Sequence, residues 1–413
     1  MAMISHLPRD LLGDILKFLP VKTLCRFKCV SKSWHSVIQS REFVKLHLQI
    51  HQHKCDGEKI FMPTHFCSAY NDPDFYILDT SSLADSENPR AKQVEIPVGR
   101  RCIILSTIVC ACNGLLFIAL DDERVLFVWN PSTGKLRRIP TLKSSSSSHF
   151  DLLYGFGYDS LHDDYKILRV CYDNGTYDCW LFSLKENTWR KLNDRVLNGY
   201  GTCNIDQVLN DAYTRAEKRA VIVCVNDSAY FIVQKEGKKY KVLSFSLAEE
   251  RFVEMLPPPC EVVGAVPILK VLAGRLSLQW RTSANHDFVV WSLMDDGNSS
   301  YWTKIISILY SETLVGLEPI CMMRNGHFVV RTKSERELFI YDMKKKAFQQ
   351  VFKHESLDVH ICSFKNTVVY TESLVHPCDY GDKVEEWTSA IEDMKESIML
   401  QNKRQFCSCC GEC

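Results

Sequence analysis

The chain has 413 residues, of which 46% are hydrophobic and 24% charged, so an intrinsically disordered protein is excluded and one or two folded domains are expected. No apolar run approaches the roughly 18 residues of a membrane-spanning helix, which argues against a spanning segment. The formal net charge is zero, but residues 1–50 hold eight Lys or Arg against three Asp or Glu, so this segment carries +5 and the remainder −5.

The first fifty residues show the spacing of short helices. Pro8 and Asp10 suit a first helical turn, where a missing N–H costs nothing and the helix dipole favours a carboxylate. Apolar residues then recur at i, i+3, i+4 and i+7 before Pro20, namely Leu12, Ile15, Leu16 and Leu19. We predict three further helices, over residues 21–30, after the N-cap candidate Ser31, and over residues 42–50.

A basic helical segment of this size has several interpretations. It cannot bury so many large apolar groups alone, so part of its surface must face the rest of the chain or a partner. The spacing leaves open a helical cap on the downstream domain and a three-helix DNA-binding module. Its basic residues are spread over all the helices, with no recognition face rich in Arg, Asn and Gln, which argues against DNA. The positive charge also fits an acidic protein partner.

The segment LPRDLLGDILKFLPVKTLCRFKCVSKSWHSVI resembles the F-box of plant proteins, without a gap from Leu7 to Trp34. This resemblance implies docking on the small acidic adaptor of an SCF ubiquitin ligase, which joins the receptor to the cullin scaffold. Gly13 departs mildly from the pattern and costs about 1 kcal/mol of helix propensity. The residues that match the motif, each expected to line the adaptor interface or the module's core, are Leu7, Pro8, Leu12, Ile15, Leu16, Leu19, Pro20, Val21, Leu24, Val30 and Trp34.

From about residue 55 the hydrophobic spacing becomes that of strands, and a two-part unit repeats. Its first half is a turn that leads into an apolar run, as in CNGLLFIAL from Cys112 and VNDSAYFIV from Val225. Its second half, two strands joined by a polar turn, starts six times, at Phe75, Val125, Cys179, Val242, Phe288 and Leu338. A period of about 50 residues is typical of kelch-like propellers, so we predict about six blades.

The ends of this region should meet. We expect the last predicted strand, within residues 361–370, to complete the first blade and close the ring. An irregular antiparallel sandwich is the alternative, because turn signals of this kind are common to all β-proteins.

Several pieces of the region resemble, in order, the F-box-associated domain of plant F-box proteins. These pieces are WNPSTGKLRRIP, GFGYDSLHDDYKILRV, the block from Trp291 to Lys304, and YTESLV from Tyr370. The likeness implies a ubiquitin-ligase receptor whose propeller captures a protein for ubiquitination and degradation. It weakens over residues 193–219 and 257–270, and no motif identifies the target or the pathway.

The chain lacks the common phosphate-binding, dinucleotide-binding, zinc-protease and nucleophile-elbow motifs. Asp163 and Asp164 are neighbours in a predicted turn, and we do not expect them to form an acid–base pair. We therefore expect no catalytic residue, no metal site and no cofactor. The resemblance implies instead a non-catalytic receptor that brings a target to a charged carrier enzyme. A propeller enzyme or carbohydrate-binding module with a helical cap is the alternative. The acidic domain argues against nucleic-acid binding.

Residues 380–413 contain a predicted helix and a cysteine-rich tail. The helix is indicated by apolar residues at spacings of 3, 4, 3 and 4, which are Val384, Trp387, Ile391, Met394 and Ile398. The cysteines of the tail lie too close together for a structural zinc site, and membrane contact is expected only if Cys410 is lipidated. An odd total of 19 cysteines and no recognisable signal peptide favour reduced thiols in the cytoplasm or nucleus.

The sequence thus predicts an α+β multidomain chain with three parts. An all-α F-box covers residues 1–50, a mainly β kelch-like propeller of about six blades covers residues 55–376, and a C-terminal helix with its tail covers residues 380–413. The expected partners are the SCF adaptor, through it the cullin scaffold, and an unknown protein substrate.

Overall fold

The computed structural model describes the residue ranges 9–52, 58–63, 65–66, 75–85, 91–96, 107–120, 125–142, 152–173, 176–192, 222–235, 239–255, 267–281, 288–295, 299–308, 317–323, 325–332, 337–353, 361–363 and 367–380. The predicted C-terminal helix and the cysteine-rich tail lie outside these residues. The helices are α1 (Arg9–Leu16), α2 (Val21–Phe27), α3 (Lys32–Gln39), α4 (Arg41–Gln52) and α5 (Thr80–Asp85). None of the described helices is long and apolar enough to cross a membrane.

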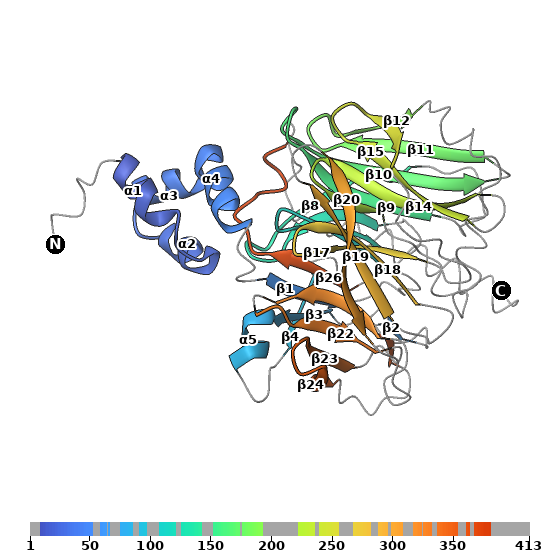
Figure 1. Ribbon diagram of the computed structural model, residues 1–413. Helices are drawn as coiled ribbons and strands as arrows, with labels where there is room; N and C mark the ends of the chain where they lie inside the picture. The colour runs from blue at the N-terminus through green and yellow to red at the C-terminus, as the bar shows by residue number, and fades with distance from the viewer. Residues whose placement is uncertain are drawn as a thin grey trace, which may run out of the picture.

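Helices α1–α4 form a small helical module beside a propeller, with α4 nearest to it (Figure 1). The described strands of the propeller form six four-stranded antiparallel blades. Blade 1 contains β26 (Val368–Thr371), β1 (Glu58–Pro63), β3 (Phe75–Asp79) and β4 (Lys92–Val94); blade 2 contains β5 (Thr107–Cys112), β6 (Leu115–Leu120), β7 (Val125–Asn130) and β8 (Lys135–Ile139); blade 3 contains β9 (Leu152–Asp159), β10 (Asp164–Asp173), β11 (Thr176–Ser183) and β12 (Thr188–Leu192). Blade 4 contains β13 (Val223–Val225), β14 (Ser228–Lys235), β15 (Lys239–Ser246) and β16 (Arg251–Glu254); blade 5 contains β17 (Ile268–Leu272), β18 (Arg275–Arg281), β19 (Phe288–Asp295) and β20 (Ser300–Ile308); blade 6 contains β21 (Glu318–Met322), β22 (Phe328–Arg331), β23 (Glu337–Asp342) and β24 (Ala347–Lys353). A separate pair joins β2 (His65–Phe66) to β25 (Ile361–Ser363).

The ring closes through its innermost strands. Each contacts the next around the ring, in the order β26, β5, β9, β13, β17, β21 and back to β26. Blade 1 joins the two ends of the region, because β26 pairs with β1 in antiparallel register, with Ile60 opposite Val369. The predicted closure is therefore confirmed, although the strand expected within residues 361–370 is split between β25 and β26.

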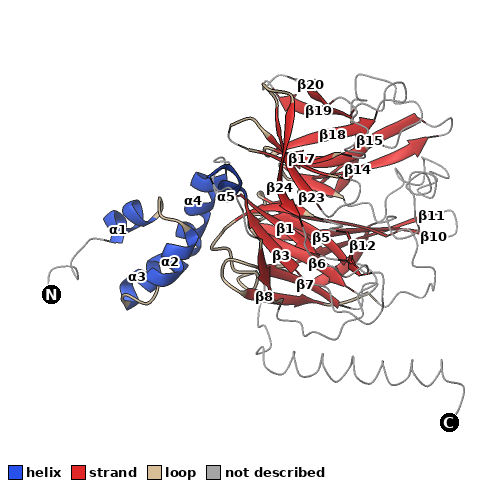
Figure 2. Ribbon diagram, turned by 90° about the horizontal axis from the view of Figure 1, so that it is seen from below, coloured by secondary structure: helices blue, strands red, loops and turns tan. Residues whose placement is uncertain are grey.

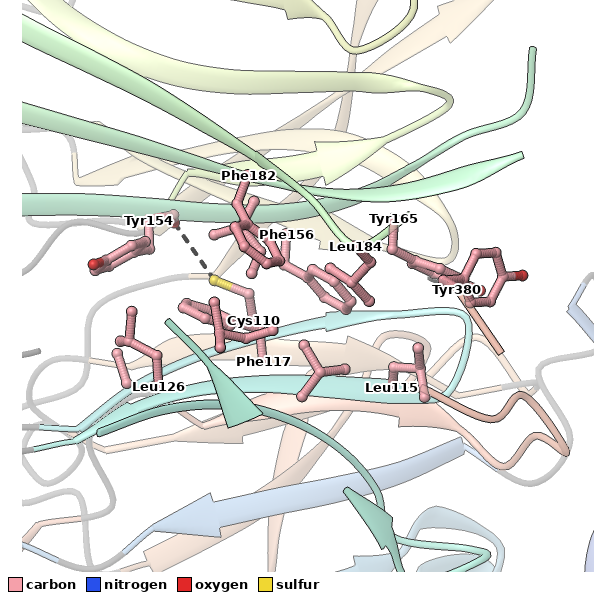
Figure 3. Packing of buried hydrophobic residues seen from close by; sticks show 14 of the residues in the cluster. Cys110, Leu115, Phe117, Leu126, Tyr154, Phe156, Tyr165, Phe182, Leu184 and Tyr380 are labelled. Atoms are coloured by element: carbon pink, nitrogen blue, oxygen red, sulfur yellow. Dashed lines mark hydrogen bonds between the residues drawn. The ribbon is translucent and has the colours of Figure 1, made fainter. Parts of the chain in front are cut away.

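A hydrophobic cluster fills each interface between neighbouring blades. Between blades 2 and 3, Phe117 on β6 meets Tyr154 and Phe156 on β9, while Tyr165 on β10 meets Tyr380 (Figure 3). Burying each of these large side chains contributes about 1.5–3 kcal/mol. The strands are shared between two interfaces, so no blade is stable without its neighbours, and the sandwich alternative is wrong.

The six predicted second halves correspond to the third and fourth strands of the six blades, from β3 and β4 in blade 1 to β23 and β24 in blade 6. The first half of the repeat, for which the sequence gives matches at Cys112, Val225, Ala273, Arg324 and Lys365, has no match in blade 3. In blade 2 the first two strands are joined by Asn113 and Gly114, both with positive φ, a geometry for which Asn-Gly is a strong sequence signal. In blade 3 the corresponding turn spans residues 160–163, and among them a positive φ occurs at Asp163. The different turn hid the similarity.

Residues 372–380, which we call the post-β26 segment, contact blades 2 and 3. Asn130 Nδ2 donates to the carbonyl oxygens of Ser373, at 3.0 Å, and Val375, at 2.7 Å. The buried Arg137 guanidinium donates to the carbonyls of Tyr380 and Leu184. Arg137 thereby ties blade 2, blade 3 and the segment together.

Replacing this guanidinium should destabilise the propeller. We expect Arg137→Met to lower the free energy of unfolding by about 3 kcal/mol, because several buried carbonyl oxygens lose their charged donor. Chemical denaturation of the full chain measures the effect. Arg138→Met, at the exposed next position on β8, is the matched control and should change stability by less than about 0.5 kcal/mol. Equal effects of the two substitutions would contradict the assigned role.

Candidate adaptor-binding module and its seat on the propeller

The helical module has a compact core of its own. Ser31 precedes α3, and its Oγ accepts a hydrogen bond from the Trp34 N–H at 3.2 Å, which confirms the predicted N-cap. The predicted second helix ends earlier than expected, at Phe27, and residues 28–30 form a turn with bonds from Cys29 N–H to Arg26 and from Val30 N–H to Phe27. The buried core of the module consists of Leu12, Leu16, Val21, Leu24, Ile38, Phe43 and Leu374.

The structure separates the motif-matched residues into groups. Leu12, Leu16, Val21 and Leu24 are buried in the core of the module. Leu19 and Trp34 pack partly buried against that core. Ile15, Pro20 and Val30 are exposed. Leu7 and Pro8 lie outside the described residues.

Helix α1 also presents an apolar stripe to solvent. Leu11 and Ile15 lie on α1 and Phe18 in the turn that follows it; they are spaced i, i+4 and i+7, and their exposed fractions are 53%, 58% and 59%. We call these three residues the α1 surface stripe. Sequence reasoning missed Leu11 and Phe18, although their spacing from Ile15 could have revealed them. Large exposed apolar side chains that lie close together are typical of a surface that binds another protein.

Two stacked histidines tie α4 to the end of α1. Nε2 of His47 lies 2.9 Å from the carbonyl oxygen of Leu19, and Nε2 of His51 lies 3.1 Å from that of Lys17. The two rings stack with centroids 4.3 Å apart. Because a carbonyl can only accept, each Nε2 must donate, and the pair satisfies carbonyls that the end of α1 leaves without helical partners.

The buried imidazole should make the module sensitive to acid. Burial, with a smaller effect of the charge on His51, lowers the pKa of His47, against the opposing hydrogen bond to Leu19. Because folding lowers the pKa of His47, its neutral imidazole contributes fully to the stability of the module above the unfolded pKa of about 6.5. This contribution is lost as the pH falls through the folded pKa. We expect the protection of amide hydrogens in α1–α4, measured as the exchange rate relative to the intrinsic rate at the same pH, to fall between about pH 7.5 and about pH 5.5. His47→Gln keeps a donor but cannot titrate, and should remove the change; equal protection of the wild type at both pH values would contradict the assignment.

The other face of α4 rests on blade 3. Asp163, at the end of the turn after β9, receives Arg41 Nη2 and Lys45 Nζ, each 2.7 Å from its Oδ2. The Tyr158 hydroxyl donates to its Oδ1 at 2.5 Å. Burial alone would raise the pKa of Asp163, but the hydrogen bonds from Lys45 and Tyr158 and the charge of Arg41 hold it below its usual value. The carboxylate therefore stays ionised at neutral pH.

Apolar contacts accompany this ion cluster. The Arg41 guanidinium lies over the Tyr380 ring, 4.8 Å from its centroid. Val44 and Leu48 of α4 pack against the cluster between blades 2 and 3. In return, Leu374 of the post-β26 segment is buried in the core of the helical module. The module and the propeller thus share side chains across their contact.

Asp163 and Asp164 have different partners, although they are neighbours in the sequence. Asp164 begins β10 and is bonded by the Ser183 hydroxyl, at 2.5 Å, and by the Lys185 N–H, at 2.9 Å. Among the described residues, no group of three or more His, Cys, Asp or Glu side chains is placed to hold a metal ion.

Comparison with known proteins matches both parts of the chain. Residues 71–377 match the family described as the F-box associated beta propeller domain, and residues 4–46 match the F-box domain. An F-box/kelch-repeat protein of Arabidopsis thaliana is 24% identical, over 91% of this chain and 96% of its own length. The F-box protein CPR1 of the same plant is also 24% identical, over 97% of each chain. Among solved structures, TolB of Acinetobacter baumannii aligns with a TM-score of 0.44 and 14% identity, over 81% of this chain and 72% of TolB.

Proposed function

The chain belongs to the F-box associated beta propeller family, and from this premise we propose that it is the substrate receptor of an SCF-type ubiquitin ligase. Its helical module is the F-box, which docks on the SCF adaptor and through it on the cullin scaffold. The propeller captures a protein target and presents it for ubiquitination.

The observation that carries this proposal is the α1 surface stripe. Leu11, Ile15 and Phe18 are exposed although the core of the F-box is filled by other residues, so they are free to contact a partner. Interfaces of this kind bury a small apolar centre surrounded by polar groups. Exposed basic residues on α2 and α3, Lys22, Arg26 and Lys32, would face an acidic adaptor and speed the encounter.

In this proposal the receptor supplies no reacting group. The carrier enzyme brings the activated ubiquitin, and the receptor holds a target lysine near it, so the chain contributes by proximity and orientation. We place this activity in the cytoplasm or nucleus, where thiols stay reduced; in the propeller, Cys110, Cys112 and Cys224 are free thiols.

Reconstitution of the ligase tests the proposal. The full chain is combined with the adaptor, the cullin scaffold with its RING protein, activating and carrier enzymes, ubiquitin and ATP. We expect ubiquitin to be attached to lysines of the receptor itself, at a rate that depends on the adaptor. If omission of the adaptor leaves the rate unchanged, or if no ubiquitin is attached with every component present, the proposed function is wrong.

A further inference from the structure

Helix α4 belongs to both parts of the molecule. Phe43 and His47 point into the F-box, where both are buried. A second side carries Arg41, Val44, Lys45 and Leu48, spaced i, i+3, i+4 and i+7, which we call the docking stripe; Val44, at its edge, also contacts the F-box core. A helix with two different contact faces cannot turn about its own axis without breaking one of them.

The docking stripe meets the propeller through contacts of different kinds. Arg41 and Lys45 pair with Asp163, Arg41 lies on the Tyr380 ring, and Val44 and Leu48 pack on the core between blades 2 and 3. Each partly exposed ion pair contributes little by itself, but together with the apolar contacts the ion pairs act on a single helix face.

Two further features restrict the same helix. Leu374 of the post-β26 segment inserts into the F-box core, where it is buried. In the sequence only residues 53–57 separate α4 from β1, a link that spans at most about 18 Å when fully extended. Figure 2 shows the F-box beside the propeller, with α4 at the place where the two parts meet. The junction therefore holds the F-box at several points.

We propose that the docking stripe and Asp163 fix the orientation of the propeller relative to the adaptor-bound F-box, and that Asp163 is a positioning residue for ubiquitin transfer. This inference rests on the proposed function. A target held by the propeller then has a defined position relative to the carrier enzyme, because the contacts of α4 fix the orientation of the propeller relative to the F-box. If this orientation varies more widely, a given target lysine lies within reach of the carrier enzyme for a smaller fraction of the time.

The test removes ionic and apolar contacts of the docking stripe together and leaves the F-box core untouched. The test variant is Leu48→Ala with Asp163→Asn, where Asn suits the positive φ of 54° at this position. The matched control is Leu46→Ala with Asp178→Asn. Leu46 lies on the same helix but is 40% exposed, and Asp178 forms a 2.7 Å ion pair with Lys191 within blade 3.

Orientation is measured first, on the free full chain. Fluorophores attached through non-canonical amino acids at His35 on α3 and at Lys345 on blade 6, both exposed, report the distance between the F-box and the propeller. We expect a narrow distance distribution for the wild type and the control, and a broader one for the test variant. An unchanged distribution in the test variant would overturn the inference.

Ubiquitin transfer is measured second, in the reconstituted ligase. We expect the test variant to bind the adaptor like the wild type, to be modified about tenfold more slowly at the lysines that the wild type uses, and to gain modification at others. The same sites and rates as in the wild type would also overturn the inference. Failure of the wild type to bind the adaptor would refute the proposed function instead, while the distance measurement on the free chain would still decide whether α4 is fixed.

Discussion

A chain that carries Ile15→Arg and Phe18→Arg binds the SCF adaptor at least about 100-fold more weakly than the wild type, a loss of about 2.7 kcal/mol. Both side chains are more than half exposed, so arginine is tolerated in the free F-box. In the complex that we propose, the same positions become buried, and the two unpaired charges must lose their water. The binding constant is measured by calorimetric titration of the purified adaptor into each chain.

The control for this prediction is a substitution of the same kind at another exposed site of the module. Leu46→Arg lies on α4, at a position that is 40% exposed and belongs neither to the α1 surface stripe nor to the F-box core. We expect it to bind within about threefold of the wild type. If the two arginines on α1 also leave the affinity unchanged, the α1 surface stripe is not part of the adaptor interface.

Leu374→Ala destabilises the F-box, although this residue follows the last strand of the propeller in the sequence. The side chain is 4% exposed and belongs to the core of the helical module, so its truncation leaves a cavity there and costs about 3 kcal/mol. A module of four short helices has little stability in reserve. We expect rapid hydrogen exchange in α1–α3, slow exchange in the inner strands of the propeller, and a weakened affinity for the adaptor.

Leu161→Ala is the matched control for this second prediction. Leu161 is 74% exposed in the turn between β9 and β10, at the same junction between the two parts of the chain. Its truncation should leave hydrogen exchange in the F-box as in the wild type. Exchange in α1–α3 that is equally slow in the Leu374→Ala chain would show that the F-box core does not depend on the propeller.

The sequence predicted those features that repeat or that follow one helix face. The six strand pairs could be found because every blade needs the same alternation and a polar turn. Leu12 and Leu16 could be placed in a core by their spacing, and both are buried. The spacing did not distinguish Ile15 from these two buried residues, although Ile15 is exposed to solvent. Which side of α1 is covered depends on where the other helices pack.

The junction between the F-box and the propeller could not be predicted. Arg41 and Asp163 are far apart in the sequence, and their meeting depends on blade 3 lying next to α4 once the ring has closed. The YTESLV run was recognised as a family hallmark, but not that Leu374 within it enters the F-box core. Contacts of this type follow from the assembled ring and leave no periodic trace in the sequence.

The most direct test of the central claim is a titration of the purified SCF adaptor into the full chain, beside a shortened chain that starts at residue 55. The account predicts one-to-one binding by the full chain with a Kd of about 1 μM or tighter, and no binding by the shortened chain. No binding by the full chain, or equal binding by both chains, would contradict the assignment of the adaptor site to the F-box.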